Sequence, residues 1–283
     1  MTLFEVILQG ILQGFTEFLP VSSSGHLSLF QYFFGLSGEE ALSFSIVLHL
    51  GTLFAVFIAF GGEIIRMIKD FFGIVADIFT GKFKPSFYDE GKKAVLMTFV
   101  ALLPLVLIVF IKDAVSAFST DEDIVVEGIC FIITGIMIFF ASKRKRNDRT
   151  AKNMTVRDSL IIGAAQTVAV MPGISRSGAT VSTGLMLGFE REFCISFSFI
   201  LGIPAILGSA VLEIPDAVAS GDILPFRLLA VGFLTSAFFG FLSIKLVKWL
   251  ITTNRYVYFS YYTVALGVFA VIFGIINKIN VGV

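Results

Sequence analysis

The chain has 283 residues, and its 21 basic residues balance 21 acidic ones. Hydrophobic residues make up 56% of it and charged residues only 15%, whereas soluble domains have about 25% charged residues. This composition excludes a disordered chain and a water-soluble globule, and it predicts a membrane protein with several spans. Because there is no excess of basic residues, we expect no nucleic-acid partner.

Six apolar stretches are long enough to cross a bilayer as helices. They are residues 42–61, 93–112, 124–141, 193–212, 226–248 and 257–277. Two further apolar regions, 3–36 and 159–189, are interrupted by polar residues, glycine and proline at 20–25 and 172–178. Since each half is too short to cross alone, we predict two re-entrant helix–loop–helix hairpins. The mixture of charged and apolar residues in 64–79 indicates an interfacial helix.

Basic residues gather in alternate loops of this six-span arrangement. Loops 62–92 and 142–158 are rich in lysine and arginine, and further basic residues flank the loop near 250, whereas the loops between them are acidic. The positive-inside rule makes the basic side cytoplasmic. Span 42–61 must therefore end in the cytoplasm. The first hairpin then opens to the outside and the second to the cytoplasm.

The two interrupted regions are related by an internal repeat with an offset of 153 residues. The matches fall mainly on glycine, serine and glutamine, and they include Gly10 with Gly163, Gln13 with Gln166, Ser22 with Ser175, Ser24 with Ser177, and Gly25 with Gly178. Each unit, 3–141 or 159–277, has one hairpin and three spans, so the second unit is inverted relative to the first. We therefore predict one membrane domain, 1–283. Its fold class is an all-α polytopic membrane protein with six transmembrane helices plus two re-entrant hairpins in an inverted-topology repeat, an arrangement that many transporters use.

The hairpin loops carry polar and ionisable residues at membrane depth, where such residues are costly and are therefore functional candidates. The candidates are Gln13, Glu17, Ser22, Ser23, Ser24 and His26 in the first region, and Ser175, Arg176, Ser177 and Thr180 in the second. Backbone N–H groups at a helix start favour an anion, and an arginine can bind phosphate oxygens through two parallel hydrogen bonds. In the repeat frame Ser23 corresponds to Arg176 and Glu17 to Val170. This asymmetry in charge favours one reactive centre over a symmetric carrier site.

Other polar residues have plainer interpretations. Serines in apolar helices often bond their own backbone, and a lone arginine often pairs with carbonyl groups. His49 lies in an uninterrupted span beside Gly51, and we interpret it as a hydrogen-bonded core residue. Cys130 and Cys194 lie in apolar stretches and are expected to be packing thiols rather than a disulfide or a metal pair.

Two motifs resemble the integral-membrane undecaprenyl-diphosphate phosphatase family, the enzymes linked to bacitracin resistance. The family's (Glu/Gln)xxxGlu pattern and its PVSSxGH run match 13–17 and 20–26, and its PGxSRSxxT motif matches 172–180. The resemblance covers essentially the whole chain, including the number of spans and the repeat. The first position here is Gln13 rather than glutamate, which weakens any claim that two carboxylates bind a metal.

The resemblance implies hydrolysis of a long-chain polyprenyl diphosphate, undecaprenyl diphosphate, on the extracytoplasmic side of the bacterial inner (cytoplasmic) membrane. The product is the monophosphate carrier lipid of cell-wall and peptidoglycan synthesis, and the prenyl tail would stay in the membrane lipid. The resemblance also implies a divalent cation, Mg²⁺ or Ca²⁺, and a homodimer.

The roles of the site residues follow as a hypothesis. Arg176 and the N–H groups near Ser22 and Ser24 would bind the diphosphate. Ser23 or His26 would attack, or activate a water, and Glu17 would orient the metal or accept the proton. The remaining candidates would line the substrate: Gln13, Ser175, Ser177 and Thr180. A covalent intermediate and direct attack by water both remain open.

The main alternative is a transporter or flippase of a polyprenyl phosphate, because inverted repeats are transporter architecture and a fold does not determine a function. The unequal charges of the two loops favour the enzyme. Phosphate release in detergent, where no vectorial transport exists, distinguishes the two.

Overall fold

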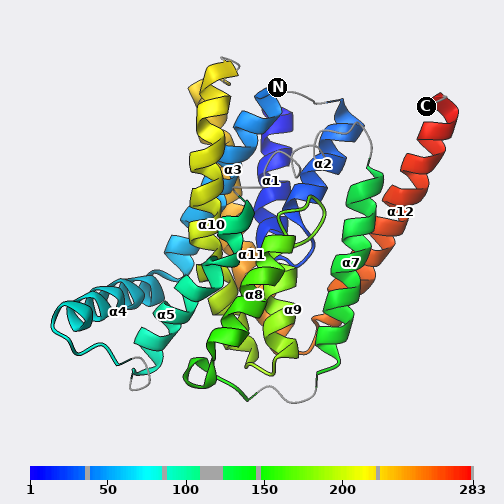
Figure 1. Ribbon diagram of the computed structural model, residues 1–283. Helices are drawn as coiled ribbons and strands as arrows, with labels where there is room; N and C mark the ends of the chain where they lie inside the picture. The colour runs from blue at the N-terminus through cyan, green and yellow to red at the C-terminus, as the bar shows by residue number, and fades with distance from the viewer. Residues whose placement is uncertain (36–38, 85–87, 109–123, 145–147, 221–223, 282–283) are drawn as a thin grey trace.

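The computed structural model describes residues 1–35, 39–84, 88–108, 124–144, 148–220 and 224–281 (Figure 1). Their helices are α1 Leu3–Phe18, α2 Ser23–Phe34, α3 Glu39–Ala59, α4 Gly61–Phe79, α5 Glu90–Leu102, α7 Val125–Ser142, α8 Val156–Val168, α9 Arg176–Met186, α10 Arg191–Ser220, α11 Phe226–Thr252 and α12 Val257–Val281, with short 3₁₀ turns η2 Pro104–Leu107 and η3 Ala151–Asn153. These residues form no β-strand, and the all-helical prediction is confirmed for them.

Four of the described helices are long and apolar enough to cross a membrane: α7, α10, α11 and α12. Each of them covers one of the predicted spans. α3 lies on a fifth, and it meets α4 at an angle of 84°. The two helices are apolar enough only together, as one broken span or a re-entrant loop. The predicted span 93–112 begins with α5, which ends at Leu102 before Pro104 opens a 3₁₀ turn. Only the last part of that prediction, 109–112, lies outside the described residues.

Both interrupted regions form pairs of short helices in contact with each other, α1 with α2 and α8 with α9. The breaks have a local cause. Ser22, at a φ of 69°, caps α2 by accepting a hydrogen bond from the N–H of Gly25, and Ser175 caps α9 in the same way through Gly178. The first pair begins and ends at the end of the molecule that carries both chain termini, and the second pair at the opposite end (Figure 1). The two loops therefore approach each other inside the protein.

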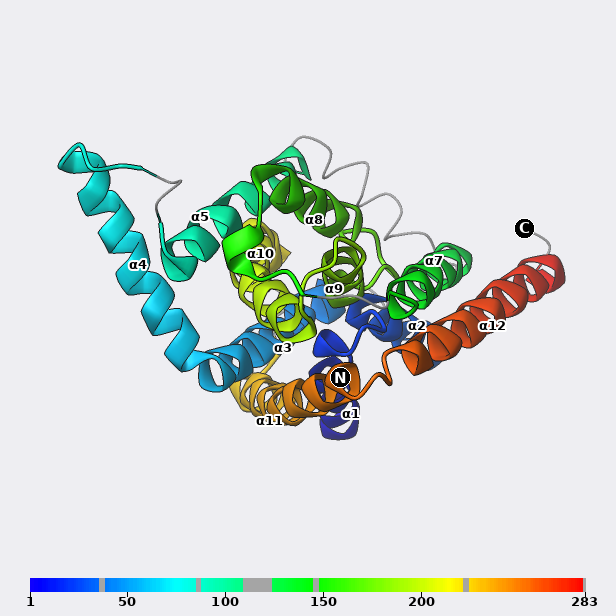
Figure 2. The same ribbon diagram turned by 90° about the horizontal axis from the view of Figure 1, so that it is seen from below.

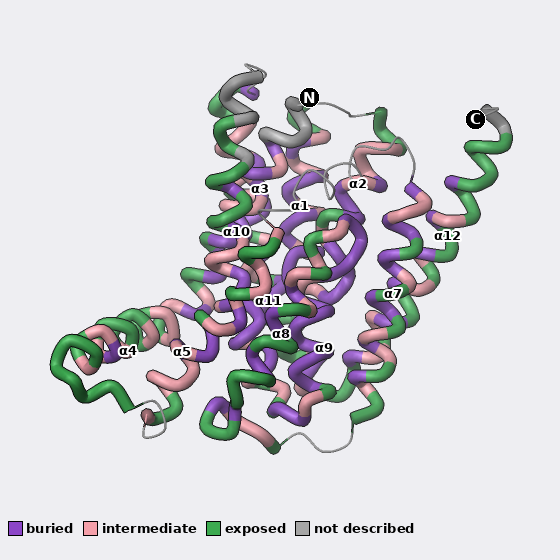
Figure 3. The backbone as a smooth tube through the Cα atoms, in the orientation of Figure 1, coloured by how far each residue is buried: buried purple, intermediate pink, exposed green. Residues whose placement is uncertain are grey.

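The longer helices surround these two pairs. α1 packs against α11 and α3, α9 packs against α7 and α10, and α3 packs against α10. In the view from below, α4 projects away from this group on one side, and α12 lies outside α7 on the other side (Figure 2). Buried residues concentrate at the centre, around the two loops, whereas α4 and α12 expose much of their surface (Figure 3).

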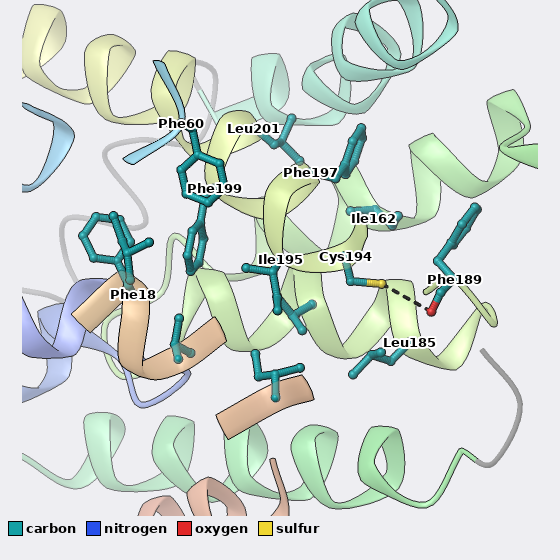
Figure 4. Packing of buried hydrophobic residues seen from close by; sticks show 14 of the residues in the cluster. Phe18, Phe60, Ile162, Leu185, Phe189, Cys194, Ile195, Phe197, Phe199 and Leu201 are labelled. Carbon is teal, nitrogen blue, oxygen red and sulfur yellow. Dashed lines mark hydrogen bonds between the residues drawn. The ribbon is translucent and has the colours of Figure 1, made fainter. Parts of the chain in front are cut away.

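The main hydrophobic cluster lies beside the loops and joins α10 to its neighbours (Figure 4). Phe199 of α10 contacts Phe18 of α1 and Phe60 after α3, with ring centroids 5.2 and 5.8 Å apart. Cys194 lies in the same cluster, where its thiol donates to the carbonyl of Phe189 at 3.7 Å. Cys194 and Cys130 are both free and buried, as predicted. This packing fixes α1, α3 and α10 relative to one another, and these three helices carry much of the site.

Candidate active site

The tips of the two hairpins meet through polar contacts. Arg176, the first residue of α9, donates from Nη2 to Oε1 of Glu17 on α1 at 2.7 Å, although the two residues are 159 positions apart. Ser177 donates to the carbonyl oxygen of Leu19 at 3.1 Å. Glycines permit the approach: a Cβ on Gly25 would lie 2.9 Å from the Cα of Gly173 in the opposite loop. The structure thus brings the acidic loop and the basic loop together, as the sequence predicted.

The carboxylate of Glu17 is the centre of these contacts. Its side chain is only 5% exposed. Besides the bond from Arg176 to Oε1, Oε2 accepts hydrogen bonds from Nε2 of Gln13 at 3.0 Å and from the hydroxyl of Ser23 at 2.7 Å. Gln13 and Glu17 are four residues apart on α1 and share a face, as their spacing predicts. Burying a carboxylate is costly unless it is paired and fully hydrogen-bonded, and this one is both.

Arg176 has hydrogen-bonding capacity to spare. Its side chain is 16% exposed, and Nη2 is occupied by Glu17. Nη1 is buried and has no hydrogen-bond partner among the described residues. A guanidinium has five N–H donors, so donors remain for the oxygens of an anion after the ion pair has formed. The start of α9 adds the positive end of a helix dipole to the same place.

The serines of the two loops make equivalent hydrogen bonds, although Ser22 has a φ of 69° and Ser175 a φ of -73°. Ser22 and Ser24 lie 3.3 Å apart through their hydroxyls, and Ser175 and Ser177 show the same spacing and distance. These four residues mainly cap and join helices. Ser23 differs because it donates directly to Glu17.

Thr180 is directed into the protein rather than toward Glu17. Its hydroxyl bonds the carbonyl of Arg176 at 2.9 Å and the hydroxyl of Ser198 at 2.6 Å. These contacts match the simpler interpretation, in which a hydroxyl in an apolar helix bonds its own backbone and here stabilises the start of α9.

His26 is buried, and its described contacts do not include the ion pair. Nδ1 donates to the carbonyl of Ser22 at 2.7 Å, which leaves Nε2 to accept from the hydroxyl of Tyr262 on α12 at 2.7 Å. The imidazole also stacks on Tyr262 and meets the edge of Phe131. Both ring nitrogens are thus engaged without Glu17 or Arg176.

His49 is the site residue that the sequence interpretation missed. Its Nδ1 donates to the carbonyl of Ser45 at 2.8 Å, as expected of a hydrogen-bonded histidine in a helix. Its Nε2, however, faces Oε2 of Glu17 at 3.8 Å, and its side chain is 30% exposed. The signal was present in the sequence, because His49 is an ionisable residue within a predicted span, the criterion that selected Glu17 and His26.

The protein oxygens around Glu17 are too few to bind a hard divalent cation by themselves, so a bound substrate would have to supply further oxygen ligands. The described residues contain no group of three histidine, cysteine, aspartate or glutamate side chains. Oε1 of Gln13 is buried without a hydrogen-bond partner among them, and it lies on the residue that donates to the carboxylate of Glu17. Mg²⁺ commonly binds through one or two carboxylates plus phosphate oxygens of a substrate. The donor set fits a cation that arrives with a diphosphate.

Comparison with known proteins identifies the family. The family model "Bacitracin resistance protein BacA" matches residues 6–269. The chain belongs to this family. Proteins named undecaprenyl-diphosphatase are similar to it over nearly their whole length. The relative from Alkaliphilus metalliredigens is 39% identical over 98% of this chain and 100% of its own. Those from Methanobrevibacter smithii and Bacteroides fragilis are 38% and 36% identical, over 95% of this chain and 96% and 97% of their own.

Proposed function

We propose that this BacA-family protein hydrolyses undecaprenyl diphosphate to undecaprenyl phosphate and inorganic phosphate. The family match and the names of the relatives support the activity. One structural observation carries it: a serine hydroxyl, a carboxylate and an arginine from opposed hairpins are joined by two hydrogen bonds of 2.7 Å. A nucleophile, a base and a cationic binder of phosphate are the groups that phosphoryl transfer requires.

In the first step, Ser23 attacks the terminal phosphorus of the diphosphate. The Oγ–phosphorus bond forms, the hydroxyl proton passes to Oε2 of Glu17, and the bond from phosphorus to the bridging oxygen breaks. Undecaprenyl phosphate leaves and takes this proton from Glu17, which becomes a carboxylate again. Arg176 binds the transferred phosphoryl group and stabilises the charge that develops on its oxygens. The observed hydrogen bond from Ser23 to Glu17 is the geometry that this proton transfer needs.

In the second step, a water attacks the phosphoserine. Its proton goes to Glu17 and then to the serine oxygen as the serine–phosphorus bond breaks, which releases inorganic phosphate and restores the hydroxyl. The position of His26, with both nitrogens bonded elsewhere, supports Ser23 rather than His26 as the nucleophile. Retention of labelled phosphate on the protein tests the covalent step.

The finer organisation follows from the same reasoning. Six spans and two re-entrant hairpins in an inverted repeat form one domain of the bacterial inner membrane. α4 lies along the cytoplasmic surface, in keeping with its 84° turn from α3. The site takes the lipid from the extracytoplasmic leaflet, its prenyl tail remains in the bilayer, and the protein functions as a homodimer.

A divalent cation, Mg²⁺ or Ca²⁺, belongs to this proposal. Glu17 and Oε1 of Gln13 are the protein groups that would bind it, with diphosphate oxygens as the other ligands. When bound, it would neutralise negative charge on the phosphates.

The decisive experiment is an assay of phosphate release from undecaprenyl diphosphate by the purified protein in detergent, with and without a chelator. Release that the chelator abolishes supports the enzyme and its cation. If the protein moves a polyprenyl phosphate across vesicles but releases no phosphate in detergent, it is the flippase alternative instead.

A further inference from the structure

Beyond the residues that the motifs contain, two positions on the neighbouring spans contact the ion pair directly. They are His49 on α3 and Gly202 on α10. The predicted repeat, with its offset of 153 residues, makes them equivalent positions. α3 and α10 pack against each other, α1 packs on α3, and α9 packs on α10. The pair formed by Glu17 and Arg176 therefore lies between the two equivalent residues.

Gly202 provides the space that the guanidinium of Arg176 occupies. A Cβ at this position would overlap Nη1 of Arg176 and would also lie 3.1 Å from Nη2, the atom that bonds Glu17. Gly202 is in the middle of α10, where glycine lowers helix stability relative to alanine. Its presence is explained by the arginine, because any larger side chain would push the guanidinium out of its position.

His49 borders Glu17 on the opposite side. The carbonyl of Ser45 can only accept a hydrogen bond, so Nδ1 carries the hydrogen and orients the ring, and Nε2 faces Oε2 of Glu17 at 3.8 Å. The side chain of His49 is 30% exposed while that of Glu17 is 5% exposed. The imidazole thus lies next to Oε2, the carboxylate oxygen that accepts from Ser23.

We propose that His49 and Gly202 are positioning residues for the Glu17–Arg176 pair, one bordering the carboxylate and the other making room for the guanidinium. The inference rests on the proposed phosphatase function. The roles proposed for His49 and Gly202 predict different kinetic effects. His49 acts through Glu17 on the nucleophile, so its loss lowers kcat. Gly202 acts through Arg176, which binds phosphate in both the ground state and the transition state, so its loss raises KM and lowers kcat.

The test for Gly202 uses the variants Gly202→Ala, Gly202→Ser and Gly202→Leu in the full-length protein. Since losing one well-placed cationic donor costs roughly 100-fold or more, we expect Gly202→Leu to lower kcat/KM by about 100-fold, with smaller losses for serine and alanine. Gly208→Leu on the same helix is the matched control, because a Cβ at Gly208 meets nothing within 4 Å. It should keep normal kinetics.

A double-mutant cycle separates positioning from a general effect on the fold. If Gly202→Leu acts by displacing the guanidinium, adding it to Arg176→Ala should cost little more, about 3-fold or less, since contacting residues are not additive. Multiplicative losses would overturn the inference. Where the leucine variant does not fold, the alanine and serine variants are measured in the same cycle.

For His49, we expect His49→Leu to lower kcat by roughly 10- to 100-fold with little change in KM, because small displacements of a catalytic group have effects of this size. His49→Gln, which keeps a polar group of similar reach, should recover most of the loss. Wild-type kinetics in His49→Leu, or no recovery in His49→Gln, would overturn the role.

A binding measurement distinguishes this inference from the proposed function. Thermal stabilisation by inorganic diphosphate is compared between the unmodified protein, Gly202→Leu and Gly208→Leu. We expect it to be lost only in Gly202→Leu. If the unmodified protein releases no phosphate from the lipid, the proposed function fails, while diphosphate binding still decides the role of Gly202. Equal stabilisation of all three proteins would reject that role.

Discussion

The two hairpins are alike in their capping hydrogen bonds and unlike in chemistry. Each has a serine that caps its second helix through the N–H of a glycine three residues later, and each has a second serine two residues after the first. Between these serines the first hairpin has Ser23 and the second has Arg176. Glu17 has no charged counterpart, because Val170 is equivalent to it. In the proposed mechanism, the first hairpin thus supplies the nucleophile and the base, and the second supplies the cation.

Among the residues that differ between the two hairpins, Arg176 is expected to have the largest effect on phosphate release. We expect Arg176→Ala to lower phosphate release by about 1,000-fold or more, because it removes the cation that binds the transferred group and leaves a buried carboxylate unpaired. Arg176→Lys is the matched control. It keeps the charge but not the planar fork, and it should recover only part of the rate. Near-normal turnover in Arg176→Ala would remove this residue from the site.

Ser23 is the next test, since it is the residue of the first hairpin that replaces the arginine of the second. Ser23→Ala should lower kcat by roughly 1,000-fold and abolish retention of labelled phosphate, because no covalent intermediate can form. Ser24→Ala is its control, as Ser24 contacts Ser22 rather than Glu17. If labelled phosphate is still retained by Ser23→Ala, the nucleophile is another residue.

The contact between the hairpin tips is tested at Gly25. A Cβ there would lie 2.6 Å from the ring of Phe131 and 2.9 Å from Gly173. Gly25→Ala should therefore destabilise the protein by about 1–3 kcal/mol, as overpacking does, and should also slow turnover by separating the two loops. Melting curves and phosphate release measured on the same sample check both effects. If neither the melting temperature nor the rate of phosphate release changes, the close approach of the two loops is not required.

The smallest effects are expected where the hairpins are equivalent. Ser22→Ala and Ser175→Ala each remove a helix cap worth about 1 kcal/mol, which corresponds to a Tm lower by about 2–4 °C. We expect similar shifts in the two variants and a loss of rate much smaller than that of Ser23→Ala. A large loss of stability in one variant alone would show that the two turns are not equivalent.

Much of the site could be predicted because its parts are local in sequence. The spacing of Gln13 and Glu17 is that of a helix face, and their hydrogen bond is present. Pro20 and the following serines predict a helix break, and α1 ends at Phe18. The opposite charges of the two loops led to the expectation that Glu17 and Arg176 meet, which they do.

Other features depended on contacts that no local pattern contains. Sequence reasoning placed His26 with the ion pair, whereas its described partners are Ser22 and Tyr262, the latter from a helix 236 residues away. It treated His49 as an ordinary core residue, and only the packing of α1 on α3 brings that histidine to Glu17. Gly202 drew no attention, since a glycine in an apolar span is unremarkable until a guanidinium is found in its side-chain space.

The sequence by itself determined the class of protein, the two helix breaks and the candidate residues for the chemistry, because hydropathy, capping and burial cost act over a few neighbouring residues. The tertiary structure alone decided which of those residues touch. Contacts between α1, α3, α9 and α10 depend on side-chain packing between helices far apart in the chain, and this packing gave Glu17 a histidine on one side and an arginine on the other.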